Sequence, residues 1–332
     1  MTKRERVMAA VSDREVDRVP VGFWAHNFAR ENSASALARE TARVAKMYDW
    51  DFVKVQSRAS YFAEGWGNRY AHSTRTAVAP TLLSHGLFSI ADLARLQPLS
   101  LHHPVLLEQQ EALRQVRELV GPDIPLVWTV FCPLTIAASL VPEGNAGIRA
   151  AMRSDPGVLM AGLEAITRTY AALSRRYVDL GADGIFYASK WVGPSMLTRE
   201  HHLRFARPFD LRVLEAAHGA PFNILHLCGE ELYFADFRDY PAAAINWTFA
   251  TGNPSFSEAI KLTDRALLGG VSPKPQFAGL TPKQVRRQVA LAIEATGGRR
   301  CLIGPGCSVN AGSPPANYRA ARAAVSADMV RS

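Results

Sequence analysis

The feature that most constrains the fold is a repeated alternation of short apolar runs with longer amphipathic stretches. The apolar runs lie at residues 19–24, 51–56, 125–131, 183–189, 222–228, 244–250, 266–271 and 300–307. Apolar residues recur with the three- and four-residue spacing of helices at 1–12, 35–48, 104–120, 156–180, 199–218, 281–296 and 314–330. This alternation is typical of repeated β–α units around a parallel sheet.

About eight strands, each followed by helical material, predict an α/β fold, a single (β/α)8 TIM-type barrel. We expect it to occupy residues 1–332 as one domain, because barrels of this length are common and no linker interrupts the chain. The opening helix, with Thr2 and Glu5 spaced as a capping box, is expected as an N-terminal extension. The less regular segment 57–100 is expected to be an insertion that contains a β-hairpin. A doubly wound open sheet is the alternative, but no GxGxxG loop follows the first strand.

Charge and composition argue against several classes of protein. The net charge is +8, but the basic residues are scattered and no zinc-finger, RNP-type or helix-turn-helix signature is present, so we expect no nucleic-acid partner. No apolar run approaches the roughly 20 residues of a membrane helix, and the first residues lack the apolar segment of a secretory signal. We therefore expect a cytoplasmic protein that is not membrane-bound. The positive charge at most favours acidic small molecules or an acidic partner protein.

The predicted ends of the strands carry residue types that bind ligands. In (β/α)8 barrels the catalytic groups sit at the C-terminal ends of the strands. The candidates for substrate binding at this mouth are Trp24, His26, Gln56, Cys132, Tyr187, Lys190 and Trp247. Their aromatic members could line a pocket for a flat donor molecule, although each of them also suits packing in the core or at the rim.

One histidine and two cysteines form a candidate metal site. Side chains alternate along a strand, so His226 and Cys228 face the same side, roughly 7 Å apart. Cys307 ends the last predicted strand, and side chains from opposite arcs of a narrow barrel can meet over its axis. Two sulfurs and one imidazole nitrogen suit Zn²⁺, and three protein ligands leave its fourth position open, as in catalytic sites. The pattern alone also fits structural cysteines and a hydrogen-bonded core histidine.

The other two cysteines are weaker ligand candidates. Cys301 begins the strand that Cys307 ends, which puts the two sulfurs on the order of 20 Å apart, and we expect it to pack in the core. Cys132 could approach the metal, line the pocket or act as a small buried apolar side chain. Four cysteines in a cytosolic chain of this size are not expected to form a disulfide framework.

Two segments make the sequence similar to a known superfamily. LHLCGE contains His226 and Cys228, and GPGCSVNAGSPPANYRAARAAV contains Cys307. They resemble the uroporphyrinogen decarboxylase superfamily, and more narrowly its zinc methyltransferase branch, the methylcobalamin:coenzyme M methyltransferases and corrinoid-dependent demethylation proteins. The similarity covers nearly the whole chain, including TKRERVMAAVSDREVDRVPVGFW, VFCPLTIAASL and GADGIFYASKW. The resemblance implies the barrel fold and implies that the three residues are zinc ligands.

Two places depart from the true decarboxylases of this superfamily. Those enzymes follow the first strand with an arginine-rich loop that grips the carboxylates of the substrate. Here the matching stretch is WAHNFARE, with His26 and Asn27 near the place of the first arginine and Arg30 near the second. The catalytic aspartate of those enzymes, expected just after the second strand, is replaced by a stretch that begins with Gln56. We therefore do not expect porphyrinogen decarboxylation.

The resemblance implies a zinc-dependent methyl (alkyl) transferase with His226, Cys228 and Cys307 at its catalytic centre. It would activate a thiol or related acceptor and take a methyl group from a corrinoid protein or a small methyl donor. The cofactor would be Zn²⁺, with methylcobalamin presented by a partner protein. Two alternatives stay open: a decarboxylase-like lyase that acts on a smaller substrate, or a non-catalytic barrel with structural zinc, whose fourth ligand could be Cys132. The donor, the acceptor and the oligomeric state are not specified by the sequence.

Overall fold

Seven strands form one curled sheet in the computed structural model, which describes residues 1–249 and 252–326. Every pairing in this sheet is parallel, and strands that follow one another in the chain are neighbours. In sheet order, the strands are β1 (Val53–Val55), β4 (Leu126–Phe131), β5 (Gly184–Ser189), β6 (Ile224–Leu227), β7 (Ala244–Trp247), β8 (Ala266–Val271) and β9 (Cys301–Pro305).

The chain segment 19–25 lies between the two edge strands of this sheet, β9 and β1. On the β9 side, an isolated parallel bridge joins Val21 to Ile303. On the β1 side, the N–H of Asp51 donates to the carbonyl of Val21 at 2.9 Å. The segment thus takes the eighth position of the ring, and the predicted (β/α)8 barrel class is confirmed.

The prediction of a regular strand at 19–24 is wrong, because the backbone groups there are used differently. Pro20 has no N–H to donate to a ladder, and the N–H of Val21 donates to the Asp51 carboxylate at 2.9 Å. The other seven strands are present, most of them shorter at one or both ends than predicted. Residue 250, at the end of the predicted strand 244–250, lies outside the described residues.

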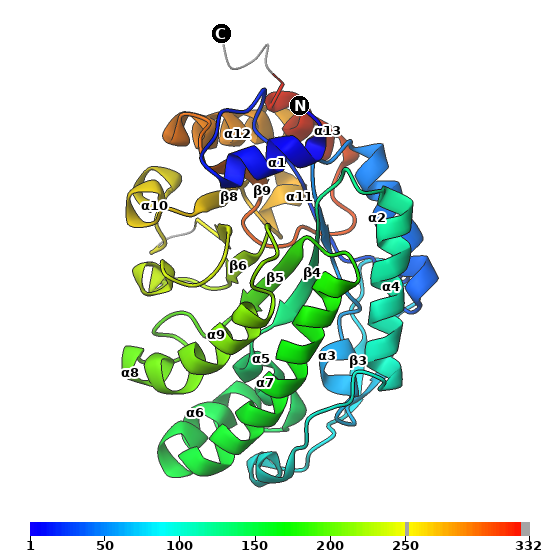
Figure 1. The fold of residues 1–332 in the computed structure, drawn as a ribbon, viewed down its shortest axis with the longest axis vertical. Coiled ribbons are helices and arrows are strands. Elements are labelled where there is room, and N and C mark those ends of the chain that lie inside the picture. The colour runs from blue at the N-terminus through cyan, green and yellow to red at the C-terminus, as the bar shows by residue number, and fades with distance from the viewer. Residues whose placement is uncertain (250–251, 327–332) are drawn as a thin grey trace.

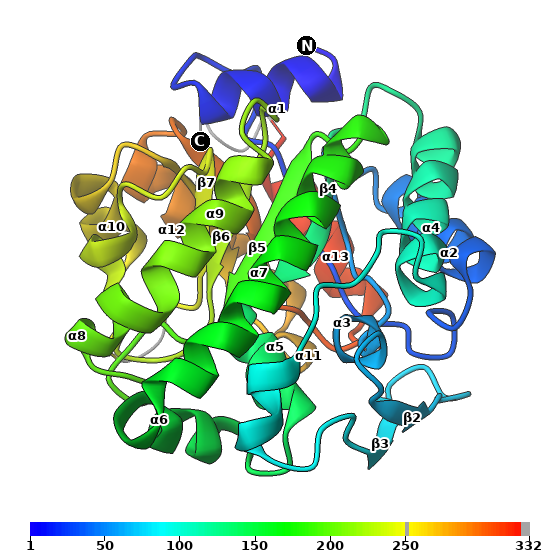
Figure 2. The same cartoon turned by 60° about the horizontal axis from the view of Figure 1, so that its bottom comes forward.

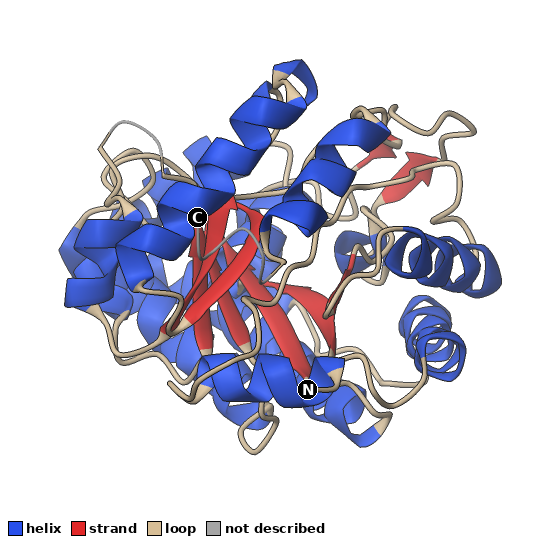
Figure 3. Cartoon of the chain, turned by 90° about the horizontal axis from the view of Figure 1, so that it is seen from above, coloured by secondary structure: helices blue, strands red, loops and turns tan. Residues whose placement is uncertain are grey.

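Helices cover the outer face of the sheet, where their apolar faces pack on the outward residues of the strands (Figures 1 and 3). The main ones are α2 (Ala34–Met47), α4 (Pro104–Val120), α7 (Pro156–Asp179), α9 (Arg207–Ala216), α10 (Phe256–Leu262), α12 (Pro282–Thr296) and α13 (Pro315–Ala324). None of the described helices combines the length and the hydropathy needed to cross a membrane.

One predicted helix, at 199–218, is divided in the structure. It consists of the short α8 (Arg199–His201), a π-helical turn η2 (His202–Ala206) and α9. Pro208 lies in the first turn of α9, and because proline has no N–H it cannot bond back to the preceding turn. The end of the predicted helix 314–330 beyond residue 326 lies outside the described residues.

Helix α1 (Lys3–Val11) closes one end of the barrel (Figure 2). Its predicted capping box is present: the Thr2 hydroxyl accepts from the Glu5 N–H, and the Thr2 N–H donates to the Glu5 carboxylate. Val7 and Ala10 on its inner face belong to the apolar cluster inside the ring. The predicted N-terminal helical extension therefore seals the barrel floor.

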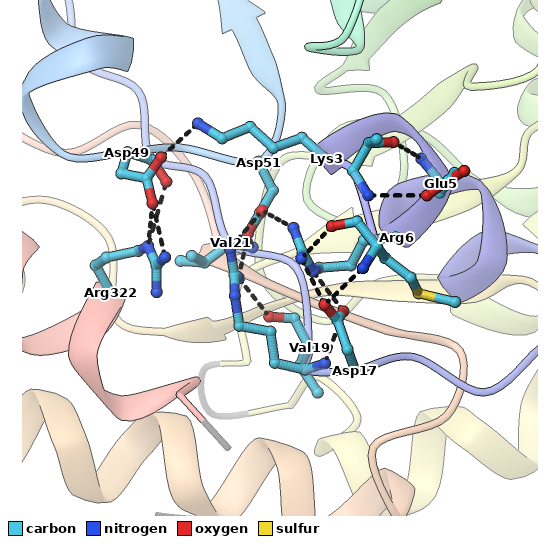
Figure 4. A network of polar contacts seen from close by, with 12 residues as sticks. Lys3, Glu5, Arg6, Asp17, Val19, Val21, Asp49, Asp51 and Arg322 are labelled. Atoms are coloured by element: carbon cyan, nitrogen blue, oxygen red, sulfur yellow. Dashed lines mark hydrogen bonds and ion pairs between the residues drawn. The ribbon is translucent and has the colours of Figure 1, made fainter. Parts of the chain in front are cut away.

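A buried network of charges fastens this end (Figure 4). The Asp51 carboxylate, which is fully buried, accepts from the Arg6 guanidinium at 2.8 Å and from Arg18 at 2.6 and 2.8 Å. Arg6 also donates twice to Asp17 at 2.7 Å. The network joins α1, the segment before the eighth position of the ring and the start of β1.

The shorter elements gather at the end of the barrel opposite α1, where the strands have their C-terminal ends (Figure 2). The predicted hairpin is present as the antiparallel pair β2 (Arg69–Ala71) and β3 (Thr81–Ser84). The remaining elements are α3 (Tyr61–Glu64), η1 (Ile90–Arg95), α5 (Pro133–Leu140), α6 (Gly144–Ser154), η3 (Phe234–Phe237) and α11 (Gln276–Gly279).

Candidate metal centre at the mouth of the barrel

Three side chains with soft ligand atoms converge at the C-terminal ends of the strands. His226 lies on β6, Cys228 follows that strand, and Cys307 follows β9. One ligand atom of each lies within 4.8 Å of the other two. His226 is buried and both cysteines are partly buried. This spacing is short enough for one ion to contact all three.

Strand alternation directs His226 and Cys228 inward. Leu225 and Leu227 pack in the core outside the sheet, so His226 points into the ring, where its imidazole stacks on the Phe186 ring at a centroid distance of 5.2 Å. The N–H of Cys228 donates to the Ser189 carbonyl at 2.8 Å, which extends the pairing with β5 beyond the strand. The first two side chains of the centre are therefore held by the sheet itself.

Cys307 reaches the same place because the chain before it passes unusually close to β7. A Cβ on Gly306 would lie 2.7 Å from the Trp247 carbonyl and 2.8 Å from the Thr248 Cα, so only glycine fits there. The N–H of Gly306 donates to the Val271 carbonyl at 2.9 Å. Two strands, β7 and β8, separate β6 from β9 in the sheet, and the ligands meet across the mouth that they enclose.

The charges of this centre are suited to a cation. A hydrogen bond between the two thiols lowers the pKa of Cys307 and raises that of Cys228, so one sulfur becomes a thiolate well before the other. The Nδ1 atom of His226 is buried and has no hydrogen-bond partner among the described residues. A bound ion could use such an atom. Two sulfurs and an imidazole are a donor set that suits Zn²⁺, and no fourth side chain from the described residues joins the group.

A pocket of about 190 Å³ is lined by Trp24 and Lys54, whose side chains both contact the Phe186 ring that stacks on His226. Four of the predicted substrate-binding residues lie in this pocket or near the metal centre. Trp24, His26 and Gln56 line this pocket. The Trp24 ring also lies 5.4 Å from the Phe186 ring that stacks on His226. Lys190 is exposed just after β5, and its positive charge opposes the rise in the pKa of Cys228.

Three other predicted substrate-binding residues do not face the inside of the ring. Tyr187 is fully buried on the outer side of β5 and donates to the Asp210 carboxylate of α9 at 2.6 Å. Trp247 packs outward, with its ring stacked on Phe256 of α10 at 5.1 Å. The prediction that these two line the mouth is wrong, because strand alternation turns them away from it.

Cys132 is the third of these residues. Its sulfur lies 3.0 Å from the Thr135 hydroxyl, and burial raises the pKa of its thiol to about 11. It is not part of the three-residue group. This placement favours the interpretation of Cys132 as a small buried side chain, and Cys301, which is fully buried in the core, behaves likewise.

Lys54 was not predicted from the sequence as a site residue, yet it lines the pocket. It is 7% exposed, projects into the ring between Val53 and Val55, and donates to the Gln56 side chain. Its ammonium lies 4.6 Å from the Phe186 ring centroid, and burial lowers its pKa to about 7. A lysine in an otherwise apolar strand, two positions before a predicted site residue, was the signal that could have identified it.

The chain matches a known family over almost its whole length. Residues 2–327 match the family described as uroporphyrinogen decarboxylase (URO-D). The methylcobamide:CoM methyltransferase MtaA of Methanosarcina barkeri is 26% identical over 215 residues, a match that covers 64% of this chain and 61% of MtaA. The chain thus spans less than two thirds of that relative.

Two further relatives cover nearly the entire chain. The methylcobamide:CoM methyltransferase MtbA of Methanosarcina acetivorans is 20% identical over 335 residues, with 96% of each chain covered. A solved structure of a methyltransferase from Methanosarcina mazei superposes with a TM-score of 0.85 at 19% identity, and the superposition covers 98% of both chains. At this identity the likeness of structures concerns the fold.

Proposed function

The chain belongs to the uroporphyrinogen decarboxylase family, and from that membership we propose that it is a zinc-dependent methyltransferase. In this proposal His226, Cys228 and Cys307 hold the metal, and a thiol is the methyl acceptor. The observation that carries the proposal is the convergence of three soft ligand atoms within 4.8 Å at the C-terminal mouth of the barrel. Relatives with this activity, MtaA and MtbA, support the choice of reaction.

The chemistry follows from the state of the acceptor sulfur. A free thiol is mostly protonated at neutral pH, and the thiolate is the nucleophile. When bound, Zn²⁺ supplies a Lewis-acidic centre that keeps a coordinated thiol deprotonated at neutral pH. The acceptor sulfur then forms a bond to the methyl carbon while the bond between the donor and that carbon breaks. The electron pair of the broken bond stays with the donor.

The chain's own residues orient these partners. His226, Cys228 and Cys307 would hold the metal, and since no fourth side chain of the described residues completes the group, the acceptor sulfur would serve as the remaining ligand. The stacked Phe186 ring fixes the plane of the His226 imidazole. We take the methyl donor to be a methylcobamide, as the names of MtaA and MtbA indicate for those relatives, and we propose that a partner protein presents it.

Porphyrinogen decarboxylation fits the site less well. In place of an acidic residue after β1, Gln56 accepts a hydrogen bond from Lys54. The following Arg58 is buried and paired with Glu64 and Glu108 outside the pocket. The pocket therefore offers no carboxylate at the position from which the decarboxylases of the family stabilise a protonated pyrrole.

The test is metal analysis of purified protein with two ligand variants. Wild-type protein should bind one equivalent of zinc, and Cys228→Ser and Cys307→Ser should each lose more than about 100-fold in zinc affinity together with methyl transfer from methylcobalamin to a thiol. Cys301→Ala, at a core position, serves as the control and should keep both. X-ray absorption should count one more sulfur around zinc when the acceptor thiol is added. Stoichiometric zinc in an active serine variant would refute the ligand assignment.

A further inference from the structure

The pocket contains a lysine and a glutamate that do not form an ion pair with each other. Lys54 and Glu31 both line it. Lys54 is 7% exposed and Glu31 is 3% exposed. Among the described residues no carboxylate lies within 4.0 Å of the Lys54 ammonium, and no lysine or arginine lies within that distance of Glu31, whose contact there is the His26 imidazole. Two buried opposite charges thus face one pocket without forming an ion pair.

Lys54 has unused hydrogen-bonding capacity. An ammonium carries three donors, and here the Gln56 side chain is its one hydrogen-bond partner among the described residues. Its ammonium lies 4.6 Å from the centroid of the Phe186 ring. The same ring stacks on the His226 imidazole. A buried ammonium in this state favours an acidic group of a ligand on the side of the pocket nearest the metal centre.

Glu31 and Asn27 each have a buried oxygen that accepts no hydrogen bond from the described residues. One Glu31 oxygen accepts from the Asn27 N–H at 3.0 Å and contacts His26 Nδ1 at 2.7 Å, while the other oxygen, Oε2, is buried without a partner. The Asn27 amide nitrogen donates to Glu40 at 2.9 Å, while its Oδ1 atom is also buried without a partner. Two acceptors on one loop therefore lack donors, and a buried acceptor without a donor is destabilising.

The remaining charges at the pocket do not supply those donors. Arg43 is held by both oxygens of Glu40 at 2.8 Å. Arg30 is exposed at the rim. The volume of about 190 Å³ corresponds to about six waters, which is enough for a molecule of amino-acid size.

We propose that this pocket binds a zwitterionic α-amino acid that carries the acceptor thiol on its side chain. Its carboxylate is held by Lys54, its ammonium by Glu31 and the Asn27 carbonyl oxygen, and its sulfur extends past Phe186 to the metal centre. This assignment rests on the proposed function for the role of the thiol. An acidic thiol without an amino group would leave the Glu31 and Asn27 acceptors unpaired.

The amino-acid part of the assignment is tested without metal and without turnover, by calorimetric titration of the metal-free protein with three matched probes. L-homoserine has both charged groups and a hydroxyl in place of the thiol. The compound 4-hydroxybutyrate lacks the ammonium, and 3-aminopropan-1-ol lacks the carboxylate. L-homoserine should bind at least about tenfold more tightly than either of the other two, because each lost charge removes a charge-assisted hydrogen bond.

Two variants test separately the binding of the ammonium by Glu31 and of the carboxylate by Lys54. Glu31→Gln keeps the shape and should weaken L-homoserine about tenfold while leaving 4-hydroxybutyrate unchanged. Lys54→Met should weaken both acids and leave 3-aminopropan-1-ol unchanged. Circular dichroism and thermal melting check that each variant is folded. Equal binding of all three probes, or no change in either variant, overturns the proposal.

The same experiment distinguishes this inference from the proposed function. Cys228→Ser should still bind L-homoserine, because the amino-acid end does not touch the metal ligands. If zinc binds and methyl groups reach 2-mercaptoethanesulfonate but not L-homocysteine, the methyltransferase assignment stands and the amino-acid assignment fails. If L-homoserine binds as expected but the protein holds no zinc, the proposed function fails. The pocket is then still assigned to an amino acid, but that amino acid is no longer assigned a thiol side chain.

Discussion

Two buried aspartates of this protein, Asp51 and Asp210, have very different neighbours. Asp51 lies between two guanidinium groups, from Arg6 and Arg18. The hydrogen-bond partners of Asp210 are the hydroxyls of Tyr187 and Tyr240, at 2.6 and 3.4 Å. Burial without an ion pair raises the pKa of Asp210 to about 7. At the scale of residues, a buried carboxyl group has two guanidinium partners in one place, and in the other it has only hydroxyl partners and a raised pKa.

Asp210→Asn should flatten the pH dependence of stability. The folded-state pKa of Asp210 lies above the unfolded value of about 3.9. Its contribution is therefore fully present below pH 4 and is lost as the pH rises to about 7. The fall in the free energy of unfolding between pH 5 and pH 8, measured with urea, should be smaller in the variant by about 2 kcal/mol. The variant Asp236→Asn, which changes a partly exposed carboxylate paired with Arg199, is the control. An unchanged slope in Asp210→Asn would contradict the prediction.

At the scale of elements, individual side chains position the ends of the strands and the segments beside them, in addition to the backbone hydrogen bonds of the sheet. The eighth position of the ring consists of bridges because the Val21 N–H bonds to Asp51 and not to a strand. At the opposite end, Gly306 lets the chain after β9 pass against β7 and brings Cys307 to β6. Both arrangements depend on a single residue type at one place.

Asp51→Asn tests the first of these arrangements. The variant leaves the Arg18 guanidinium without its counter-ion and Arg6 with Asp17 alone, and breaking a buried pair by removing one partner costs about 3–5 kcal/mol. We expect a loss of that size in the free energy of unfolding. The control is Asp49→Asn in the same network (Figure 4), because Asp49 is 56% exposed in its pairs with Lys3 and Arg322. That variant should lose less than about 1 kcal/mol, and similar losses in both would show that burial is not the cause.

At the scale of the whole molecule, the candidate metal centre connects distant parts of the ring. His226 and Cys228 belong to β6 and its end, and Cys307 follows β9, with β7 and β8 between them. A metal held by all three would be a cross-link over the mouth. Because the group forms only in the folded barrel, metal binding favours the folded state.

Zinc should therefore raise the melting temperature of metal-stripped protein. At a free concentration of 100 times the Kd the stabilisation is about 2.7 kcal/mol. For a chain of 332 residues this corresponds to a shift of about 4 °C. Differential scanning calorimetry measures the shift, with Cys228→Ser as the variant that should show none. An equal shift in both proteins would mean that zinc stabilises the fold from another place.

The order of the strands and helices could be predicted from the sequence because it depends on local pattern. The alternation of apolar runs with helical periodicity determined the barrel class, and the Thr2–Glu5 spacing determined the cap of α1. The pair His226 and Cys228 was predictable because two residues on one strand share a face. These are relations between residues that are close in the chain.

Relations between distant residues were decided by the tertiary structure alone. The sequence predicted that Cys307 meets His226 and Cys228, but only by assuming a closed barrel. No local pattern indicates that Lys54 and Glu31 line one pocket, or that Tyr187 and Trp247 turn outward against α9 and α10. Which face of a strand lies inside depends on the register of the closed ring, and a shift of one residue would exchange the two faces. The sequence by itself therefore determined the elements and the shared face of two of the three metal-site residues, His226 and Cys228, whereas ring closure brought Cys307 to them and formed the nearby pocket.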